Sequence, residues 1–230
     1  EGTTEAQHVQ MLLQMNISGA IAVSGMPADT LSSVAPYELL INSGVPVVFI
    51  NSYSSDLAAT FYSTSDEEGV KAAITHLSSL GHQKIGLAIG SMRYLPSQRK
   101  REAFHNAGFD AASVSTTDYT VEGGQLAANK LIATGHTAII CGSDMMALGA
   151  IRASNALGLS VPEDISVIGY DDSPLMAFTD PPLTTVRQPV ESISRAAVKS
   201  VLNPEQQHTE STEFMFHPDL IIRGSTGAIS

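Results

Sequence analysis

The sequence predicts an α/β protein built on parallel sheets, and two observations carry this prediction. Apolar, β-rich runs alternate along the 230 residues with segments of helical period, which is the order of repeated βαβ units. The run at residues 46–50 (PVVFI) lacks polar alternation, as expected for a strand covered by helices on both faces. The 43% hydrophobic composition suffices for one large core or two smaller ones.

In the first half of the chain, apolar residues at helical spacing predict helices, and the β-rich runs between them predict strands. In order, we expect a helix over 5–16, a strand over 20–24, a helix over 36–43, a strand over 46–50, a helix over 66–80, a strand over 84–89 and a helix over 97–107. The segment 52–65 is rich in Ser and Thr and is expected to be a loop or hinge.

The same patterns continue in the second half. We expect a weak strand near 112–115, a helix over 121–133, a strand over 138–141, a helix over 144–157, a strand over 166–170, a strand ending at Val186, a helix over 190–201, and a final pair of short strands over 214–216 and 220–223. The segment 171–182 is rich in Asp and Pro and is expected to be a second loop or hinge.

The charge of the chain argues against nucleic acid as a direct partner. Twenty-three acidic residues against 12 Lys and Arg give a net charge of -11, which repels a phosphate backbone. The longest basic cluster is residues 99–101, and the chain has no tryptophan to stack on bases. A small polar ligand is therefore favoured over DNA as the direct partner of this chain.

The cysteine and the chain start bear on the compartment. Cys141 is the single cysteine and lies in the apolar run 137–141, where it is expected to be buried and cannot form an internal disulfide. The sequence begins EGTT without a basic region or an apolar run, so no secretory signal is visible, and no run is long enough to span a membrane. These features favour a cytoplasmic protein.

Polar residues follow several predicted strands. An open parallel sheet binds ligands beyond the carboxyl ends of its strands, and the residues there are Asn51, 91–99, Ser143 with Asp144, and Asp171 with Asp172. Donors and acceptors of this kind suit a ligand with several hydroxyl groups.

Enzyme and metal chemistry lack their sequence signatures. The seven histidines show no metal-ligand spacing, and the chain contains no G-x-S-x-G, G-x-x-x-x-G-K-[ST] or G-x-G-x-x-G motif. We therefore expect no enzymatic activity, no cofactor and no metal.

Four motifs together resemble the LacI/GalR family of sugar-responsive transcription regulators. They are DEEG with HLSSLGHQKI (66–69 and 76–85), TAIICGSDMMALGA (137–150), VPEDISVIGYDD with PPLTTVRQP (161–172 and 181–189), and LIIRGST (220–226). They occur in the family's order and extend over nearly the whole chain.

The resemblance implies two doubly wound parallel-sheet subdomains joined by crossover strands, a periplasmic binding protein-like fold of type I. By that match, residues 1–64 and 188–211 form the N-subdomain, and residues 65–187 and 212–230 form the C-subdomain. The family's DNA-binding head, hinge helix and first β-α unit precede the part that matches residue 5, so the N-subdomain is expected to be incomplete. A homodimer, a small carbohydrate effector in the cleft between subdomains, and DNA binding through the absent head are the partners that the family implies.

The resemblance also assigns ligand-binding roles, each with a simpler alternative. Asp171 matches an acid that accepts hydrogen bonds from sugar hydroxyls; alternatively, it forms a turn with Asp172. A family arginine after the strand at 84–89 matches Arg99 or Arg101, with the register left open by the spacing to Phe104. Their alternative is a solvated basic helix face.

Four further positions match ligand contacts of the family. Ser143 takes a polar position but is also a preferred helix N-cap, and Tyr119 matches an aromatic ring that packs on the sugar but could be a loop aromatic. Asn51 and Gln188 match polar contacts, although Asn in a turn and Gln in a solvated strand need no ligand.

The predicted function is therefore the ligand-sensing and dimerisation domain of a LacI/GalR-type regulator, in which a sugar controls operator binding by shifting two conformations. The first alternative is a periplasmic sugar-binding protein of a transporter, which resembles this family in fold and cleft chemistry. The second is a sugar-acting enzyme on the same scaffold, since fold does not determine function.

Overall fold

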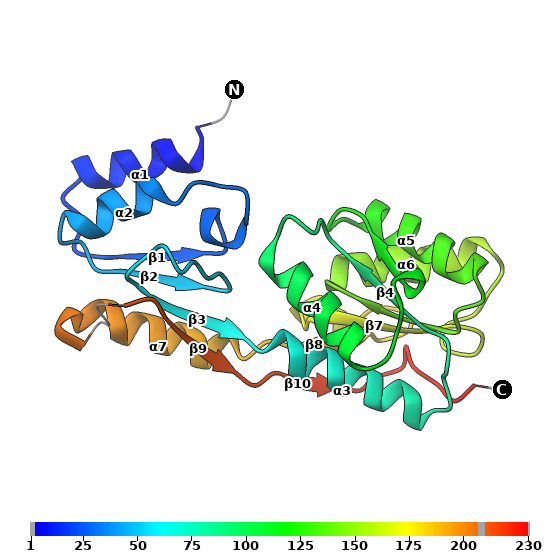
Figure 1. Ribbon diagram of the computed structural model, residues 1–230. Helices are drawn as coiled ribbons and strands as arrows, with labels where there is room; N and C mark the ends of the chain where they lie inside the picture. Colours follow the sequence, from blue (N-terminus) through cyan, green and yellow to red (C-terminus); the bar gives the residue numbers. More distant parts are fainter. Residues whose placement is uncertain (1–2, 207–209, 230) are drawn as a thin grey trace. The chain divides into compact units, whose positions relative to one another are not determined.

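The computed structural model describes residues 3–206 and 210–229, and these residues form two compact units (Figure 1). Unit 1 comprises residues 3–64, 93–96, 189–206 and 210–216, and unit 2 comprises residues 65–92, 97–188 and 217–229. Each unit is an α/β structure with its own hydrophobic core. No helix of the described residues is long and apolar enough to cross a membrane.

Unit 1 is built on a four-stranded parallel sheet of order β1-β2-β3-β9. Its strands are β1 (Ala20–Val23), β2 (Val47–Ile50), β3 (Thr60–Thr64) and β9 (Thr212–Phe216), and its helices are α1 (Glu5–Gln14), α2 (Ala35–Asn42) and α7 (Val190–Leu202), with short 3-10 turns η1 (Met26–Ala28) and η4 (Pro204–Gln206). Figure 1 shows α1 and α2 on one face of this sheet and α7 on the other.

Local sequence explains how unit 1 begins and what fills its core. Thr4 accepts a hydrogen bond from the backbone N–H of Gln7, and the Gln7 side chain accepts one from Thr4 N–H, which is a capping box for α1. Between the sheet and α2, the rings of Phe49 and Phe61 stack with centroids 5.0 Å apart, and Leu40 is fully buried beside them. This aromatic layer supplies much of the apolar area that stabilises the unit.

Unit 2 has a six-stranded sheet of order β10-β8-β7-β6-β4-β5, in which only the β10–β8 pair is antiparallel. Its strands are β4 (Ile85–Ile89), β5 (Val114–Thr116), β6 (Ala138–Cys141), β7 (Ser166–Asp171), β8 (Thr184–Arg187) and β10 (Asp219–Ile221). Its helices are α3 (Asp66–Ser79), α4 (Leu95–Asn106, whose first two residues belong to unit 1), α5 (Val121–Ala133) and α6 (Asp144–Ala156), with 3-10 turns η2 (Ala111–Ser113) and η3 (Pro174–Ala177).

Two cores lie on the two faces of this sheet. One is formed with α5 and α6, and it includes the buried Cys141; the other is formed with α3 and α4. The helices α5 and α6 touch through glycine, because a Cβ atom on Gly149 would lie 2.0 Å from the carbonyl oxygen of Val121. The strands β4, β6 and β7 are parallel, so their carboxyl ends lie at one edge of the sheet, with helix starts beside them.

Two expectations from the sequence need correction. The segment 52–65 was expected to be a loop, but it contains β3, whose Thr60 and Ser63 are buried. Hydroxyl side chains made this strand look polar, although Thr fits a pleated sheet well. The two last predicted strands were both expected in the C-subdomain, but β9 pairs with β3 in unit 1, whereas β10 pairs with β8 in unit 2. The unit boundary therefore follows residue 216 and not residue 211.

Candidate functional site

Asp171 is the last residue of β7 and the centre of the candidate site in unit 2. Its backbone has a φ of 113°, in a region that residues other than glycine rarely adopt. Its Oδ1 accepts a hydrogen bond of 2.6 Å from the Gln188 side chain, so two residues singled out by the sequence meet here. Burial raises the pKa of Asp171 to about 6, although the bond from Gln188 acts to lower it.

Lys100 is a buried cation whose charge acts on the Asp171 carboxylate, and the sequence interpretation had overlooked it. It is 5% exposed, its Nζ lies 2.5 Å from Oδ1 of Asp66, and it stands 4.0 Å from the centroid of the Tyr170 ring. Tyr170 in turn donates a 3.0 Å hydrogen bond to Asp66 Oδ1. Burial is the largest single influence and acts to lower the pKa of Lys100, but Asp66, Tyr119 and Asp171 together outweigh it, so the pKa is raised and the ammonium stays charged.

The orientation of α4 places Arg99 and Arg101 differently from Lys100. Arg101 is exposed and Arg99 is partly buried. The buried face of α4 carries Ser97, Lys100 and Phe104, whose spacing of three and four residues defines one side of a helix. That spacing is visible in the sequence and could have identified Lys100 as the inward cation. The ligand role of Arg99 and Arg101 stays a prediction.

Tyr119 packs over the carboxyl ends of two strands. A Cβ atom on Gly90 would lie 2.0 Å from its ring and one on Gly142 would lie 3.0 Å from it. The lack of a side chain at these two glycines, which follow β4 and β6, therefore leaves room for the ring. Its hydroxyl is 2.8 Å from the Ser97 hydroxyl, and the residue is 37% exposed. An aromatic surface is thus available at this edge of the sheet.

Ser143 follows β6 and acts as the N-cap of α6. Its hydroxyl accepts a 3.3 Å hydrogen bond from the backbone N–H of Met146, which is the simpler of the two roles the sequence allowed. A hydroxyl that accepts one bond still has a proton to donate, and Ser143 is partly exposed. The cap and a ligand contact are therefore compatible.

Asn51 belongs to unit 1, where it follows β2. Its backbone has a φ of 52°, and its side-chain oxygen accepts a 3.0 Å hydrogen bond from Thr64 N–H, so it braces the turn at the end of the sheet. Nearby in the sequence, Tyr53 lines a pocket of about 320 Å³ together with Asp29. An ion pair with Arg93, 2.5 Å long, holds the pKa of Asp29 well below its usual range.

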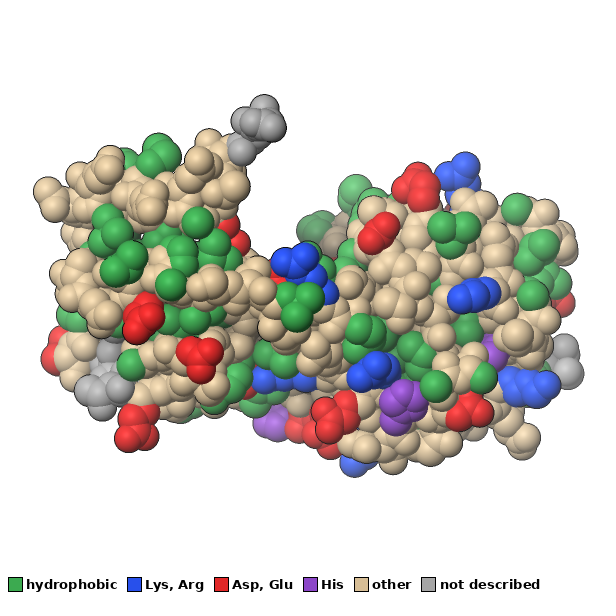
Figure 2. Space-filling model, turned by 45° about the horizontal axis from the view of Figure 1, so that its top comes forward, with side chains coloured by type: hydrophobic (Ala, Val, Ile, Leu, Met, Phe, Trp, Pro, Cys, Tyr) green, Lys and Arg blue, Asp and Glu red, His purple; other side chains and the backbone are tan. Residues whose placement is uncertain are grey.

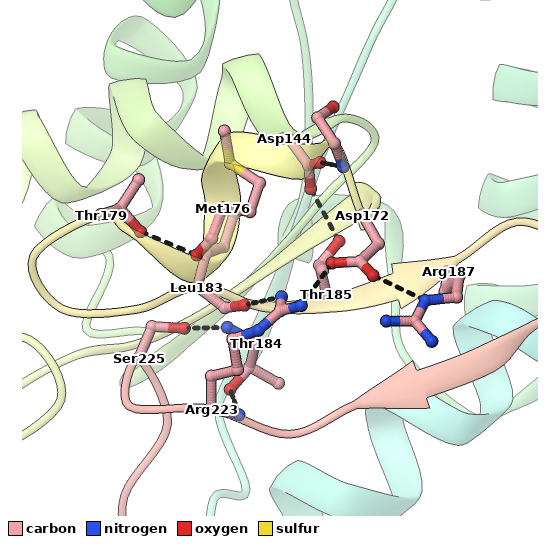
Figure 3. A network of polar contacts seen from close by, with 11 residues as sticks. Asp144, Asp172, Met176, Thr179, Leu183, Thr184, Thr185, Arg187, Arg223 and Ser225 are labelled. Atoms are coloured by element: carbon pink, nitrogen blue, oxygen red, sulfur yellow. Dashed lines mark hydrogen bonds and ion pairs between the residues drawn. The ribbon is translucent and has the colours of Figure 1, made fainter.

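A second acid, Asp172, is paired within the protein. Its carboxylate lies 2.6 Å from Arg187 and 2.7 Å from Arg223, and Figure 3 shows it between the two guanidinium groups. Burial acts to raise the pKa of Asp172, but the two arginines outweigh it and the pKa is lowered. Arg223 comes from the LIIRGST motif, which connects that motif to the Asp171–Asp172 turn.

The chemistry at this edge of unit 2 is that of hydrogen bonding. A carboxylate, hydroxyls, an amide and an aromatic ring stand at the ends of neighbouring strands, which suits a ligand with adjacent hydroxyl groups. In residues 3–206 and 210–229, no three His, Cys, Asp or Glu side chains form a group that could hold a metal ion. On the face drawn in Figure 2, the Lys and Arg side chains of unit 2 stand apart from one another and form no continuous basic patch.

Comparison with known proteins identifies the family. Residues 74–226 match the family model of the periplasmic binding protein-like domain. The HTH-type transcriptional regulator MalR of Streptomyces coelicolor is 48% identical over 239 aligned residues, which cover 99% of this chain and 69% of MalR.

Two solved structures are similar over almost the whole chain. A LacI-family transcriptional regulator from Enterococcus faecium, solved with bound ribose, is 26% identical with a TM-score of 0.84. The match covers 99% of this chain and 86% of the chain in that structure. The Lac repressor dimer bound to operator and the anti-inducer ONPF is 27% identical with a TM-score of 0.82, covering 97% and 78%. These relatives are transcription regulators and not enzymes. The chain belongs to the LacI family of transcription regulators and contains that family's periplasmic-binding-protein-like, effector-binding domain.

Proposed function

We propose that this domain senses a small carbohydrate, with Asp171 as the principal hydrogen-bond acceptor for sugar hydroxyls. The observation that carries the proposal is the Asp171–Gln188 pair at the carboxyl end of β7, bonded at 2.6 Å. Ser143 follows the adjoining strand β6, and the Tyr119 ring lies over the residues that follow β4 and β6. The E. faecium relative was solved with ribose, which supports a sugar as the effector class.

The remaining ligand contacts of the proposal come from several elements. Tyr119 offers its ring face to the sugar, Ser143 and Gln188 offer donors, and Arg99 or Arg101 offers a guanidinium from α4. The ligand role of Asn51, which belongs to unit 1, stays a prediction from the family resemblance. Lys100 is added to this set as the buried cation that keeps the neighbourhood of Asp171 from accumulating uncompensated negative charge.

The regulatory part of the proposal follows from the family. Sugar binding shifts the domain between two conformations by its differential affinity for them, and this shift controls operator binding by a DNA-binding head outside the chain. We infer a homodimer, because the Lac repressor relative is a dimer on its operator and two heads read a two-fold site. A regulator of genes acts in the cytoplasm, which is the compartment we assign.

A thermal-shift and calorimetry panel tests the sensor. Purified chain is mixed with ribose, glucose, maltose, cellobiose, glucose 6-phosphate and adenine; a sugar at ~100 times its Kd adds about 2.7 kcal/mol of stability. The variant Asp171→Asn keeps the shape of the side chain and tolerates positive φ, so it is expected to remain folded and to lose the shift. Asp110→Asn, at a surface 3-10 turn, is the matched control. Equal shifts in wild type and Asp171→Asn would refute the role of Asp171.

A further inference from the structure

Two consecutive residues at the candidate site hold a backbone conformation that needs support. Asp171 has a φ of 113° and Asp172 a φ of 56°, and neither is glycine. A residue other than glycine persists in such a conformation only where its surroundings determine it. The contacts that hold this turn therefore decide where the Asp171 carboxylate lies.

Asp144 contacts this turn from the start of α6. It is the first residue of the helix, after the N-cap Ser143, and it is 1% exposed. Its Oδ2 accepts a 2.7 Å hydrogen bond from the backbone N–H of Ser173, and its Oδ1 accepts a 2.6 Å bond from the hydroxyl of Thr185 on β8. Figure 3 shows the carboxylate above Thr185, reaching from the helix to the strand.

The sheet beneath Asp144 is shaped to admit its carboxylate. A Cβ atom on Gly169 of β7 would lie 2.5 Å from Asp144 Oδ1, so a larger residue there would displace the acid. An acid in the first turn of a helix gains its favourable dipole interaction while exposed, and burial is not needed for it. Burial in fact raises the pKa of Asp144, which means that ionising it here is unfavourable compared with water. The buried placement is explained by its two bonds.

We propose that Asp144 is a positioning residue for ligand binding: by holding Ser173 N–H and Thr185 together, it keeps Asp171 in its left-handed conformation at the end of β7. The inference rests on the proposed function, because Asp171 is the acceptor whose position it sets. Two sets of contacts hold the turn after Asp171. The ion pairs with Arg187 and Arg223 hold Asp172, and the bond to Asp144 holds the backbone of Ser173.

Two variants of the full chain remove this anchor by different routes. Asp144→Asn is isosteric but can satisfy only one of the two donors as an acceptor, because its NH₂ group then faces the other. Thr185→Val keeps the strand and the shape of the side chain while removing one donor. Asp110→Asn is the matched control, since its carboxylate also accepts from a backbone N–H but at the amino end of β5, opposite the candidate site.

Two ligand-free measurements decide the proposal. Amide hydrogen exchange at Ser173 is expected to be at least ~10-fold faster in Asp144→Asn than in wild type, with a smaller increase in Thr185→Val and none in the control. Carboxyl ¹³C NMR is expected to show a lower pKa for Asp171 in Asp144→Asn, because the negative charge of Asp144 helps to raise it. Thr185→Val keeps the negative charge of Asp144, so a lower pKa of Asp171 in that variant reports a change in the position or burial of Asp171 and not the lost charge.

Calorimetry with ribose, maltose and cellobiose then connects position to binding. For a sugar that wild type binds, Asp144→Asn is expected to raise Kd by ~10-fold or more and Asp110→Asn to leave it unchanged. Unchanged Ser173 exchange and an unchanged Asp171 pKa in Asp144→Asn would overturn the positioning role, as would an unchanged Kd. If no sugar binds wild type while both ligand-free measurements shift as expected, the positioning of Asp171 stands and the sugar-sensing proposal is the one that fails.

Discussion

Replacing Lys100 by Met tests the buried ion pair beneath the candidate site. The variant keeps most of the unbranched stem that packs on Tyr170, so the main change is the loss of the ammonium 2.5 Å from Asp66. The side chains of Lys100 and Asp66 are 6% and 9% exposed, so water cannot replace the lost partner. Removing one partner of a buried pair costs about 3–5 kcal/mol, and the hydrogen bond from Tyr170 to Asp66 carries no compensating charge.

Urea unfolding followed by circular dichroism measures this effect, with tyrosine fluorescence as a second probe because the chain has no tryptophan. With a slope of ~2 kcal/mol per M, the expected loss lowers the midpoint of the unit 2 transition by about 2 M. Lys71→Met, an exposed lysine on α3, is the matched control and is expected to change stability by no more than ~0.5 kcal/mol.

A double variant separates lost attraction from an unpaired charge. Asp66→Asn combined with Lys100→Met removes both charges, so it is expected to recover a large part of the stability lost in Lys100→Met. A loss below ~1 kcal/mol in the single variant, or a double variant that is no more stable than the single one, would contradict the assignment of this pair as buried and mutually dependent.

Three further predictions concern the same unit. The pKa of Asp171 is raised to about 6 in the folded chain, so folding takes up a proton at this group between about pH 4 and pH 6. The contribution of this group to the free energy of unfolding is therefore expected to be highest below about pH 4 and to decline as the pH rises to about 6. Sugar affinity measured by calorimetry is expected to fall below about pH 6, because the acceptor becomes protonated. Gly149→Ala is expected to destabilise by ~2 kcal/mol or more in thermal melts, since the new Cβ would lie 2.0 Å from the Val121 carbonyl; a change under ~0.5 kcal/mol would contradict the tight α5–α6 contact. Arg223→Met, with the guanidinium lost from Asp172, is expected to cost about 1–3 kcal/mol in urea unfolding, and an unaltered midpoint would mean that Arg187 alone suffices.

Much of the secondary structure could be predicted from local sequence. The bounds 121–133 and 138–141 were predicted as found for α5 and β6, because a Thr or Ser cap and a strictly apolar run identify such elements without help from tertiary contacts. The Asp171–Asp172 turn was also visible, since Asp is a turn-forming residue and the pair follows a buried strand. The ligand roles of the individual residues stay predictions.

Some features could not be inferred from local pattern. β3 was hidden by its hydroxyl residues, which are polar in sequence but lie within a sheet that satisfies their backbone. The two last strands are short and similar in composition, and only pairing with partners more than 30 residues distant separates β9 in unit 1 from β10 in unit 2.

The sequence by itself determined the α/β class, the family and the acid at the end of β7, because periodicity, caps and motif order are local properties of the chain. Helical spacing could mark Lys100 as the inward residue of its helix, but tertiary structure alone decided that it pairs with Asp66 and that Asp144 reaches Ser173 and Thr185. The physical reason is that a charged group enters a protein interior only with a partner, and the partners here lie 29 to 41 residues away along the chain. No local pattern specifies such a pairing, since it exists only once strands and helices have packed.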